Sequence, residues 1–183
     1  MTTIRIDRAP VLAMWASVVA ERLGWPHETA LTLGQAVADM TTRATDDRLG
    51  THAQSGDRPL ADVTDALREV PLLGQIVHVA STPEGPRAVS KNALLEPDAV
   101  ARYLRDKFGN QLCAALTAME RLAATMSTDA LNEEAFRFYE HFRPDAPSGV
   151  SGAEGILDLG LIHALVRTRS SSDHCRLKSR NSA

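Results

Sequence analysis

The sequence predicts a mainly α-helical protein, with one multi-helix domain over residues 1–163 and a single small β-hairpin near residues 75–90. Three observations support this fold class. Apolar residues recur at steps of three and four along residues 9–45 and again along residues 97–142. Clear β character is confined to the hairpin segment. Apolar residues make up 44% of the 183 residues and charged residues 23%, which is enough apolar material for a packed core.

Residues 9–45 are predicted to form two packed helices that nucleate the core. The apolar positions of the first helix share one stripe, namely Val11, Leu12, Trp15, Val18, Val19 and Leu23. Gly24 suits the end of that helix, and Pro26 suits the first turn of the next. The second helix presents Ala30, Leu33, Val37 and Met40 on one side. Because about three residues join the two helices, we expect them to pack against each other.

The same stretch resembles a helix-turn-helix DNA-binding motif over residues 16–33. The resemblance implies that the second helix enters a major groove, with His27, Thr32 and Arg43 as candidate DNA contacts. The start of that helix contains no Lys or Arg, and Glu28 would face phosphates. A plain helical hairpin explains the same residues, so DNA binding is an alternative hypothesis rather than the leading one.

Residues 46–59 are polar and predict a long loop, and residues 60–70 return to helical spacing. The hairpin follows, with strands on either side of the turn sequence TPEG. Three helices and then a hairpin is also the order of a winged-helix domain, which is a second route to DNA binding. The third helix, however, offers only Arg68 for DNA contact.

His78 lies in the apolar first strand of the predicted hairpin. It is the candidate residue for a third hypothesis, a small-molecule binder or enzyme with a pocket near the hairpin. No second His, Cys or acidic residue lies at metal-ligand spacing from it. A structural or solvent-facing histidine is therefore the simpler interpretation.

Residues 97–142 predict three helices, over residues 97–108, 110–126 and 128–142. The last helix carries FRFYEHF, although aromatic residues make up only 4% of the chain. Phe138, Tyr139 and Phe142 are therefore the candidate residues of a protein–protein interface. Packing of these rings in the core, or in a homodimer seam, is the alternative.

Residues 143–155 predict a Pro/Gly/Ser-rich linker, and residues 156–166 are compatible with a short helix or strand that packs back onto the body. Residues 164–183 hold five Lys or Arg and one Asp, a net charge of +4, which leaves −7 for residues 1–163. We expect this basic tail to be disordered because it is poor in apolar residues. The acidic body disfavours broad affinity for nucleic acids or membranes.

The chain contains no glycine-rich nucleotide loop, no nucleophile elbow and no zinc-protease motif. Cys113 and Cys175 belong to no C-x-x-C pair, which favours reduced thiols in a cytoplasmic protein. No run of 18 apolar residues and no apolar signal core occurs. We therefore expect a cytoplasmic location, no membrane contact, no cofactor, no metal site and no catalytic residue, and enzymatic activity is disfavoured.

The segments PVLAMWASVVAERLGWP, VASTPEGPRAVSK and YLRDKFG resemble a group of small bacterial proteins of unknown function. The resemblance covers roughly residues 10–155 and implies a bacterial origin, but it assigns no activity and no functional residue. The ending SSSDHCRLKSRNSA differs from the usual end of that group. The leading hypothesis is a non-enzymatic helical interaction module that acts as a homo-oligomer, with a different protein as the other partner class.

Overall fold

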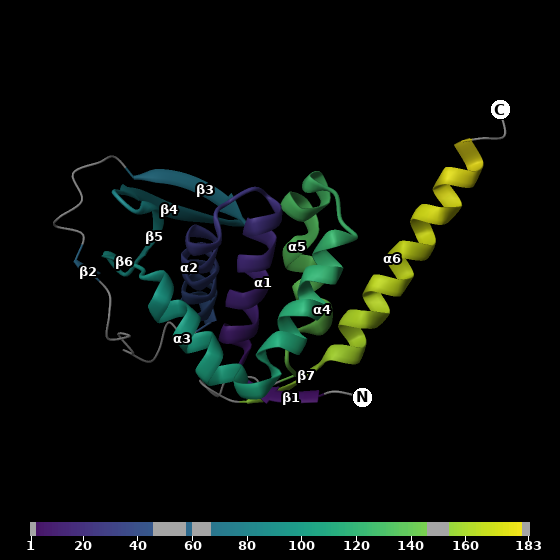
Figure 1. Cartoon of the computed structure of the whole chain (residues 1–183), viewed down its shortest axis with the longest axis horizontal. Coiled ribbons are helices and arrows are strands. Elements are labelled where there is room, and N and C mark those ends of the chain that lie inside the picture. The colour runs from purple at the N-terminus through teal and green to yellow at the C-terminus, as the bar shows by residue number, and fades with distance from the viewer. Residues whose placement is uncertain (1–2, 46–57, 60–66, 146–153, 181–183) are drawn as a thin grey trace.

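The computed structural model describes residues 3–45, 58–59, 67–145 and 154–180, with side chains over residues 3–42, 67–145 and 154–170 (Figure 1). In chain order the elements are β1 (Thr3–Ile6), α1 (Arg8–Arg22), α2 (His27–Thr45), β2 (Arg58–Pro59), β3 (Arg68–Leu72), β4 (Gln75–Thr82), β5 (Gly85–Ser90), β6 (Ala93–Leu94), α3 (Pro97–Phe108), the short 3-10 helix η2 (Gly109–Gln111), α4 (Leu112–Ala124), α5 (Thr128–Phe142), β7 (Gly155–Asp158) and α6 (Leu159–Arg180).

The prediction of a mainly α fold with one hairpin is wrong, because the chain forms a mixed α/β fold with two antiparallel sheets. The larger sheet has the order β2-β6-β5-β4-β3, and the smaller sheet pairs β1 with β7. Strands β4 and β5 form the expected hairpin, with Val79 opposite Ala88. Further strands therefore extend that hairpin on both of its edges.

Strand β3 occupies the end of the segment that the spacing assigned to a third helix. Five residue pairs join β3 to β4, from Arg68 opposite Val79 to Leu72 opposite Gln75. Val70 and Leu72 are buried, whereas Pro71 between them is exposed. This alternation, and the tolerance of an edge strand for proline, favour a strand over a helix here. Residues 60–66 of the predicted helix lie outside the described residues.

Helices α1 and α2 lie side by side at the centre of the molecule, as predicted (Figure 1). The sheet of β3, β4 and β5 packs on one side of this pair, and α4 and α5 lie on the other. Gly34 is the point of closest approach: a Cβ there would lie 2.1 Å from Ser17 Oγ and 2.3 Å from the Ala13 carbonyl oxygen. Only glycine fits this helix crossing.

Residues 164–180 of the tail that was predicted to be disordered are helical, because α6 runs without interruption from Leu159 to Arg180. The first turn is anchored in the core by Leu159 and Ile162, and Asp158 Oδ1 accepts a hydrogen bond from the Gly160 amide at 2.8 Å. Residues 161–180 contain neither Gly nor Pro, so a helix that starts there can propagate. The expected boundary between residues 163 and 164 therefore falls within one helix.

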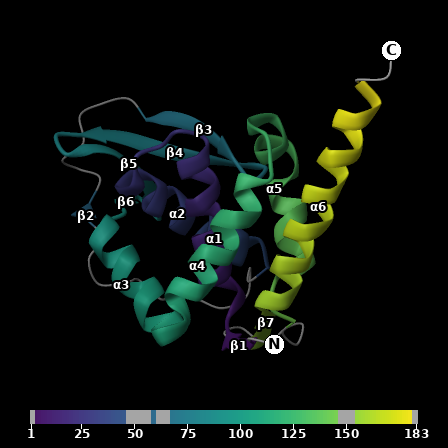
Figure 2. The same cartoon turned by 45° about the vertical axis from the view of Figure 1, so that its right-hand side comes forward.

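The start of the described chain pairs with the strand that precedes α6 in the sheet of β1 and β7, where Thr3 lies opposite Asp158. Figure 2 shows α6 starting beside this sheet and running up along α4 and α5. Among the described residues, no helix combines the length and the apolar character needed to span a membrane.

Candidate functional site

Helix α2 carries a polar stripe that its apolar periodicity does not reveal. The α2 polar stripe consists of Thr29, Thr32, Gln35 and Asp39, at steps of three and four residues. It faces β5 and is linked to it at three levels. Thr29 Oγ1 donates to the Pro86 carbonyl at 2.7 Å, and Ser90 Oγ donates to Asp39 Oδ2 at 2.7 Å. Hydrogen bonds from side chains thus fix the strand along the helix.

Thr32 makes the middle contact of the stripe. Its hydroxyl accepts the Ala88 amide of β5 at 3.0 Å and donates to the Thr29 carbonyl at 2.8 Å. The side chain has no exposed surface. A buried amide without an acceptor is strongly disfavoured. The Thr32 hydroxyl therefore takes the place of the carbonyl oxygen that a neighbouring strand would offer to the Ala88 amide.

The stripe ends in two side chains that are tied to each other. Gln35 Nε2 donates to Asp39 Oδ1 at 2.8 Å, while Ser90 occupies Asp39 Oδ2. This bond sets the orientation of the Gln35 amide, because the opposite orientation would place two acceptor oxygens against each other. Gln35 is only 3% exposed, and its Oε1 atom is buried with no hydrogen-bond partner among the described residues. An acceptor is therefore left over inside the molecule.

Tyr103 of α3 lies close to the same end of the stripe. Burial raises the pKa of Tyr103 to about 12, and the negative charges of Asp7 and Asp39 add to the rise. Asp7 Oδ2 accepts from Lys107 Nζ at 3.0 Å, but its Oδ1 is buried without a partner among the described residues. We call Asp7, Gln35, Asp39, Ser90 and Tyr103 the acceptor cluster. Its two buried atoms without a partner among the described residues, Asp7 Oδ1 and Gln35 Oε1, are both hydrogen-bond acceptors.

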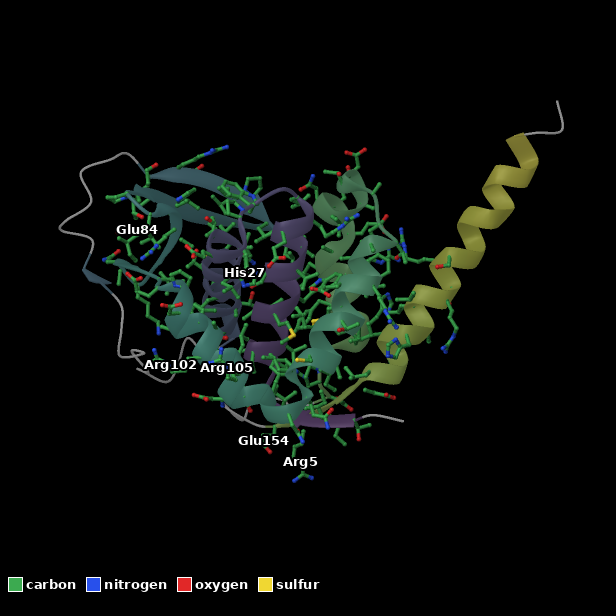
Figure 3. The ribbon with its side chains drawn as sticks, in the orientation of Figure 1. Arg5, His27, Glu84, Arg102, Arg105 and Glu154 are labelled. Atoms are coloured by element: carbon green, nitrogen blue, oxygen red, sulfur yellow. The ribbon has the colours of Figure 1, made fainter. Side chains whose placement is uncertain are left out.

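A shallow depression of about 140 Å³ lies at the other end of α2, between its first turn and the β4–β5 turn. His27 and Glu84 line it from the two sides (Figure 3). Each basic side chain there already has an acidic partner, since His27 Nδ1 lies 2.6 Å from Glu21 Oε1 and Arg87 donates to Glu96. These pairs join neighbouring elements, so neither His27 nor Arg87 is left as an unpaired basic group for a ligand.

Of the three candidate DNA contacts, Thr32 is closed to DNA in this conformation. His27 is exposed, but Thr32 is buried, and the side chain of Arg43 lies outside the described side chains. Every residue from 29 to 38 is buried, because α1 and β5 cover α2. A recognition helix needs an open face, so this geometry argues against α2 in that role. Figure 3 shows two exposed cations elsewhere, Arg102 and Arg105 of α3.

His78 is not among the residues that line the depression beside α2. It is exposed on β4, directly opposite Glu69 of β3. Its neighbours Val77 and Val79 are buried, so His78 points to the opposite, solvent-facing side of the sheet. This solvent-facing position agrees with the simpler of the two interpretations of His78.

The aromatic residues of α5 form part of the core of one chain. Tyr139 and Phe142 are buried, and the Phe142 ring meets Trp15 edge to face with the ring centres 5.5 Å apart. Tyr139 also donates its hydroxyl hydrogen to the Arg8 carbonyl at 3.2 Å. Phe138 is half-buried beneath the Arg169 guanidinium, which lies 4.8 Å from the ring centre. Tyr139 and Phe142 are therefore core residues, in agreement with the alternative of core packing, whereas an interface at Phe138 stays a prediction.

No group of three or more His, Cys, Asp or Glu side chains is placed to hold a metal ion in the part of the chain that the structure describes. Cys113 is exposed on α4 with a free thiol. The acceptor cluster remains as the most unusual chemistry of the described side chains.

The sequence analysis missed Gln35, Asp39, Ser90 and Tyr103. A signal was present, because Thr29, Thr32, Gln35 and Asp39 repeat at helical spacing, and the residues between Thr29 and Asp39 are otherwise small or apolar. Their partners on β5 and α3 could not be found in the same way, because only the fold brings those elements to α2.

The chain matches no protein-family model, no curated protein and no solved structure. The resemblance to a group of small bacterial proteins stays a prediction.

Proposed function

We propose that this chain is a non-enzymatic interaction module that forms a homo-oligomer, and that α6 is its contact element. The observation that carries the proposal is that α6 continues well beyond the part that packs on its own body. The proposal replaces the aromatic face of α5, which is buried within one chain, as the site of contact. It includes a cytoplasmic location, which rests on the sequence.

The first half of α6 is held firmly against the body. Leu159 and Ile162 are buried, and Leu165 and Val166 are partly buried against the core. Arg169 then reaches α5, where it stacks on Phe138 and lies 3.8 Å from Glu134 Oε2. These contacts fix the direction in which the helix leaves the body.

The second half of α6, residues 170–180, leans away from α4 and α5 (Figure 1). At 1.5 Å per residue this half is roughly 16 Å long. Helices in proteins owe most of their stability to packing against other elements, so a half-helix that leaves its own body is suited to packing on a partner.

Charge favours a second copy of the chain as that partner. Residues 170–180 hold three Lys or Arg and one Asp, a net charge of +2, while residues 1–163 carry −7. A basic helix that projects from an acidic body is complementary to the acidic body of another copy. In a two-fold dimer each copy would give its helix to the other, which closes the assembly.

Apolar surface near the start of α6 adds to this contact. Leu161 is 49% exposed, and Ile156 on the preceding strand β7 is also exposed. Exposed apolar side chains at the start of a projecting helix are suited to contact with a partner protein. Single exposed residues occur on any protein, so Leu161 is tested against a matched residue below.

The experiment is a mass measurement by light scattering across a wide range of protein concentration, at low and high salt. We expect a dimer at low salt that dissociates at high salt, because screening weakens contacts between exposed charges. Removal of residues 171–183 should give a monomer, since it takes away the part of α6 beyond Ser170 and keeps the contacts of Arg169 with α5. A mass that stays monomeric at every concentration, or a dimer that survives the removal, would overturn the proposal.

Two substitutions sharpen the test. Leu161→Ser should weaken the dimer at least severalfold. Ile76→Ser is the matched control, because Ile76 is also 49% exposed but lies on β4, away from α6. Equal effects of the two substitutions would count against α6 as the contact element.

A further inference from the structure

We propose that the projecting half of α6, residues 170–180, binds the outer side of α5 on a second copy of the chain. The observation is that these two helical segments carry charges of opposite sign in matching order when they run antiparallel. The inference rests on the proposed homo-oligomer and names the surface that receives α6.

Helix α5 is the most acidic of the described helices. It holds four Asp or Glu and one Arg, a net charge of −3, whereas α2, the next most acidic, carries −1. Its charged residues Asp129, Glu133 and Arg137 are exposed and follow one another at steps of four residues. This spacing places them on one side of the helix, and we call them the α5 charged stripe.

The projecting half of α6 carries the reverse order of charges. Its sequence has Asp173, Arg176 and Arg180 at steps of three and four residues, which also belong to one side of a helix. Both segments are helical, so residues advance along them by the same rise of about 1.5 Å. An antiparallel pair therefore brings the one Asp of α6 level with the one Arg of α5, and the two Arg positions of α6 level with the two acidic residues of the α5 charged stripe.

The two matching segments of one chain are kept apart by the direction of α6. Arg169 stacks on Phe138 of its own α5, with the guanidinium carbon 4.8 Å from the ring centre. Beyond Arg169, residues 170–180 lean away from α5 (Figure 1). The helix thus carries its charged positions away from the α5 charged stripe of its own chain, and a second copy offers the same stripe to them.

A second copy of α6 is a less suitable surface than α5. Helix α6 holds five Lys or Arg and one Asp, so two copies of it would bring like charges together. The complementary charge lies on α5. We therefore assign the contact to α5, and in a two-fold dimer it would occur twice.

The experiment measures the dissociation constant of the dimer formed by the full chain, by light scattering, with charge-reversal variants. Glu133→Lys should weaken the dimer about tenfold, because the reversal replaces attraction by repulsion at both copies of the contact. Arg176→Glu should weaken it by a similar factor. The double variant with both reversals should regain most of the lost affinity, since the two copies then present opposite charges to each other again.

Asp106→Lys is the matched control, because Asp106 is an exposed carboxylate on α3 and the change in net charge is the same as in Glu133→Lys. It should leave the dissociation constant nearly unchanged. Circular dichroism of each variant shows whether the helices are retained. A double variant that regains no affinity, or an equal loss of affinity in the control, would overturn the assignment to α5.

The chain without residues 171–183 separates this inference from the proposed homo-oligomer. If that truncation gives a monomer while both single reversals leave the dimer intact, α6 is the contact element but the α5 charged stripe is not its surface. If the full chain is monomeric at every concentration, the homo-oligomer and this inference both fail.

Discussion

The hydroxyl of Thr32, buried in the middle of α2, accepts the amide hydrogen of Ala88 on β5 at 3.0 Å. A helix side chain thus satisfies a strand amide at a place where a sheet would normally continue. On the same helix, Thr29 donates a hydrogen bond to the Pro86 carbonyl, and Asp39 accepts one from the Ser90 hydroxyl. The position of β5 on the central helix is therefore set by directed hydrogen bonds as well as by apolar packing, which makes the junction specific.

Thr32→Val should destabilise the protein by about 1–3 kcal/mol, because it keeps the shape of the side chain but leaves the Ala88 amide buried without an acceptor. Thr32→Ser is the matched control, since it keeps the hydroxyl and loses only a methyl group. Urea denaturation of the two variants measures the free energy of unfolding. A valine variant that is no less stable than the serine variant would show that this hydrogen bond contributes little.

The helical core could be predicted because its signals are local. Gly24 and Pro26 mark the junction of α1 and α2 in the sequence, and the structure places the start of α2 at His27. The same holds for α3, where Pro97 occupies the first turn. Helix ends of this kind are encoded within a few residues, so no tertiary information is needed to find them.

The strands and the acceptor cluster could not be predicted in the same way, because they depend on partners far along the chain. Val70 fits a helical stripe with Leu67, yet pairing with β4 makes Arg68–Leu72 a strand. Asp39 looks like an ordinary solvated acid until β5 brings Ser90 to it, 51 residues later. Long-range pairing overrides local preference at these places.

Gly34→Ala should destabilise the protein by about 1–3 kcal/mol, even though alanine is the better helix former by roughly 1 kcal/mol. The added methyl group would lie 2.3 Å from the Ala13 carbonyl oxygen, which is backbone and cannot move aside without separating α1 from α2. Gly160→Ala is the control, because the nearest atom there belongs to the Asp158 side chain at 2.9 Å. Thermal unfolding of both variants tests this, and equal melting temperatures would contradict the tight crossing.

The two tyrosines of the chain should both titrate well above their ordinary pKa in the folded protein. Burial raises the pKa of Tyr103 and of Tyr139 to about 12 each, from a reference value of 10. Ultraviolet absorbance of tyrosinate should therefore rise near pH 12 in the native protein and near pH 10 in urea. A native titration midpoint close to 10 would mean that the phenols are open to solvent.

The same shift has a consequence for stability. Between about pH 10 and pH 12 the unfolded chain releases the phenol protons while the folded chain keeps them, so the stabilising contribution is full below pH 10 and declines up to about pH 12. Tyr103→Phe removes the titrating group, so its melting temperature should fall less steeply over this range than that of the unchanged protein. Parallel curves for the two proteins would contradict the assignment.

Phe142→Ala and Phe138→Ala should separate the two roles considered for the aromatic helix. Phe142 is buried against Trp15, so its truncation should cost about 3–5 kcal/mol and unfold a marginally stable domain. Phe138 is half-buried beneath Arg169, so its truncation should cost much less and leave the fold intact. Denaturant unfolding gives both values. If the Phe142 variant instead remains folded and changes only the mass measured by light scattering, Phe142 contacts a partner and the core assignment is wrong.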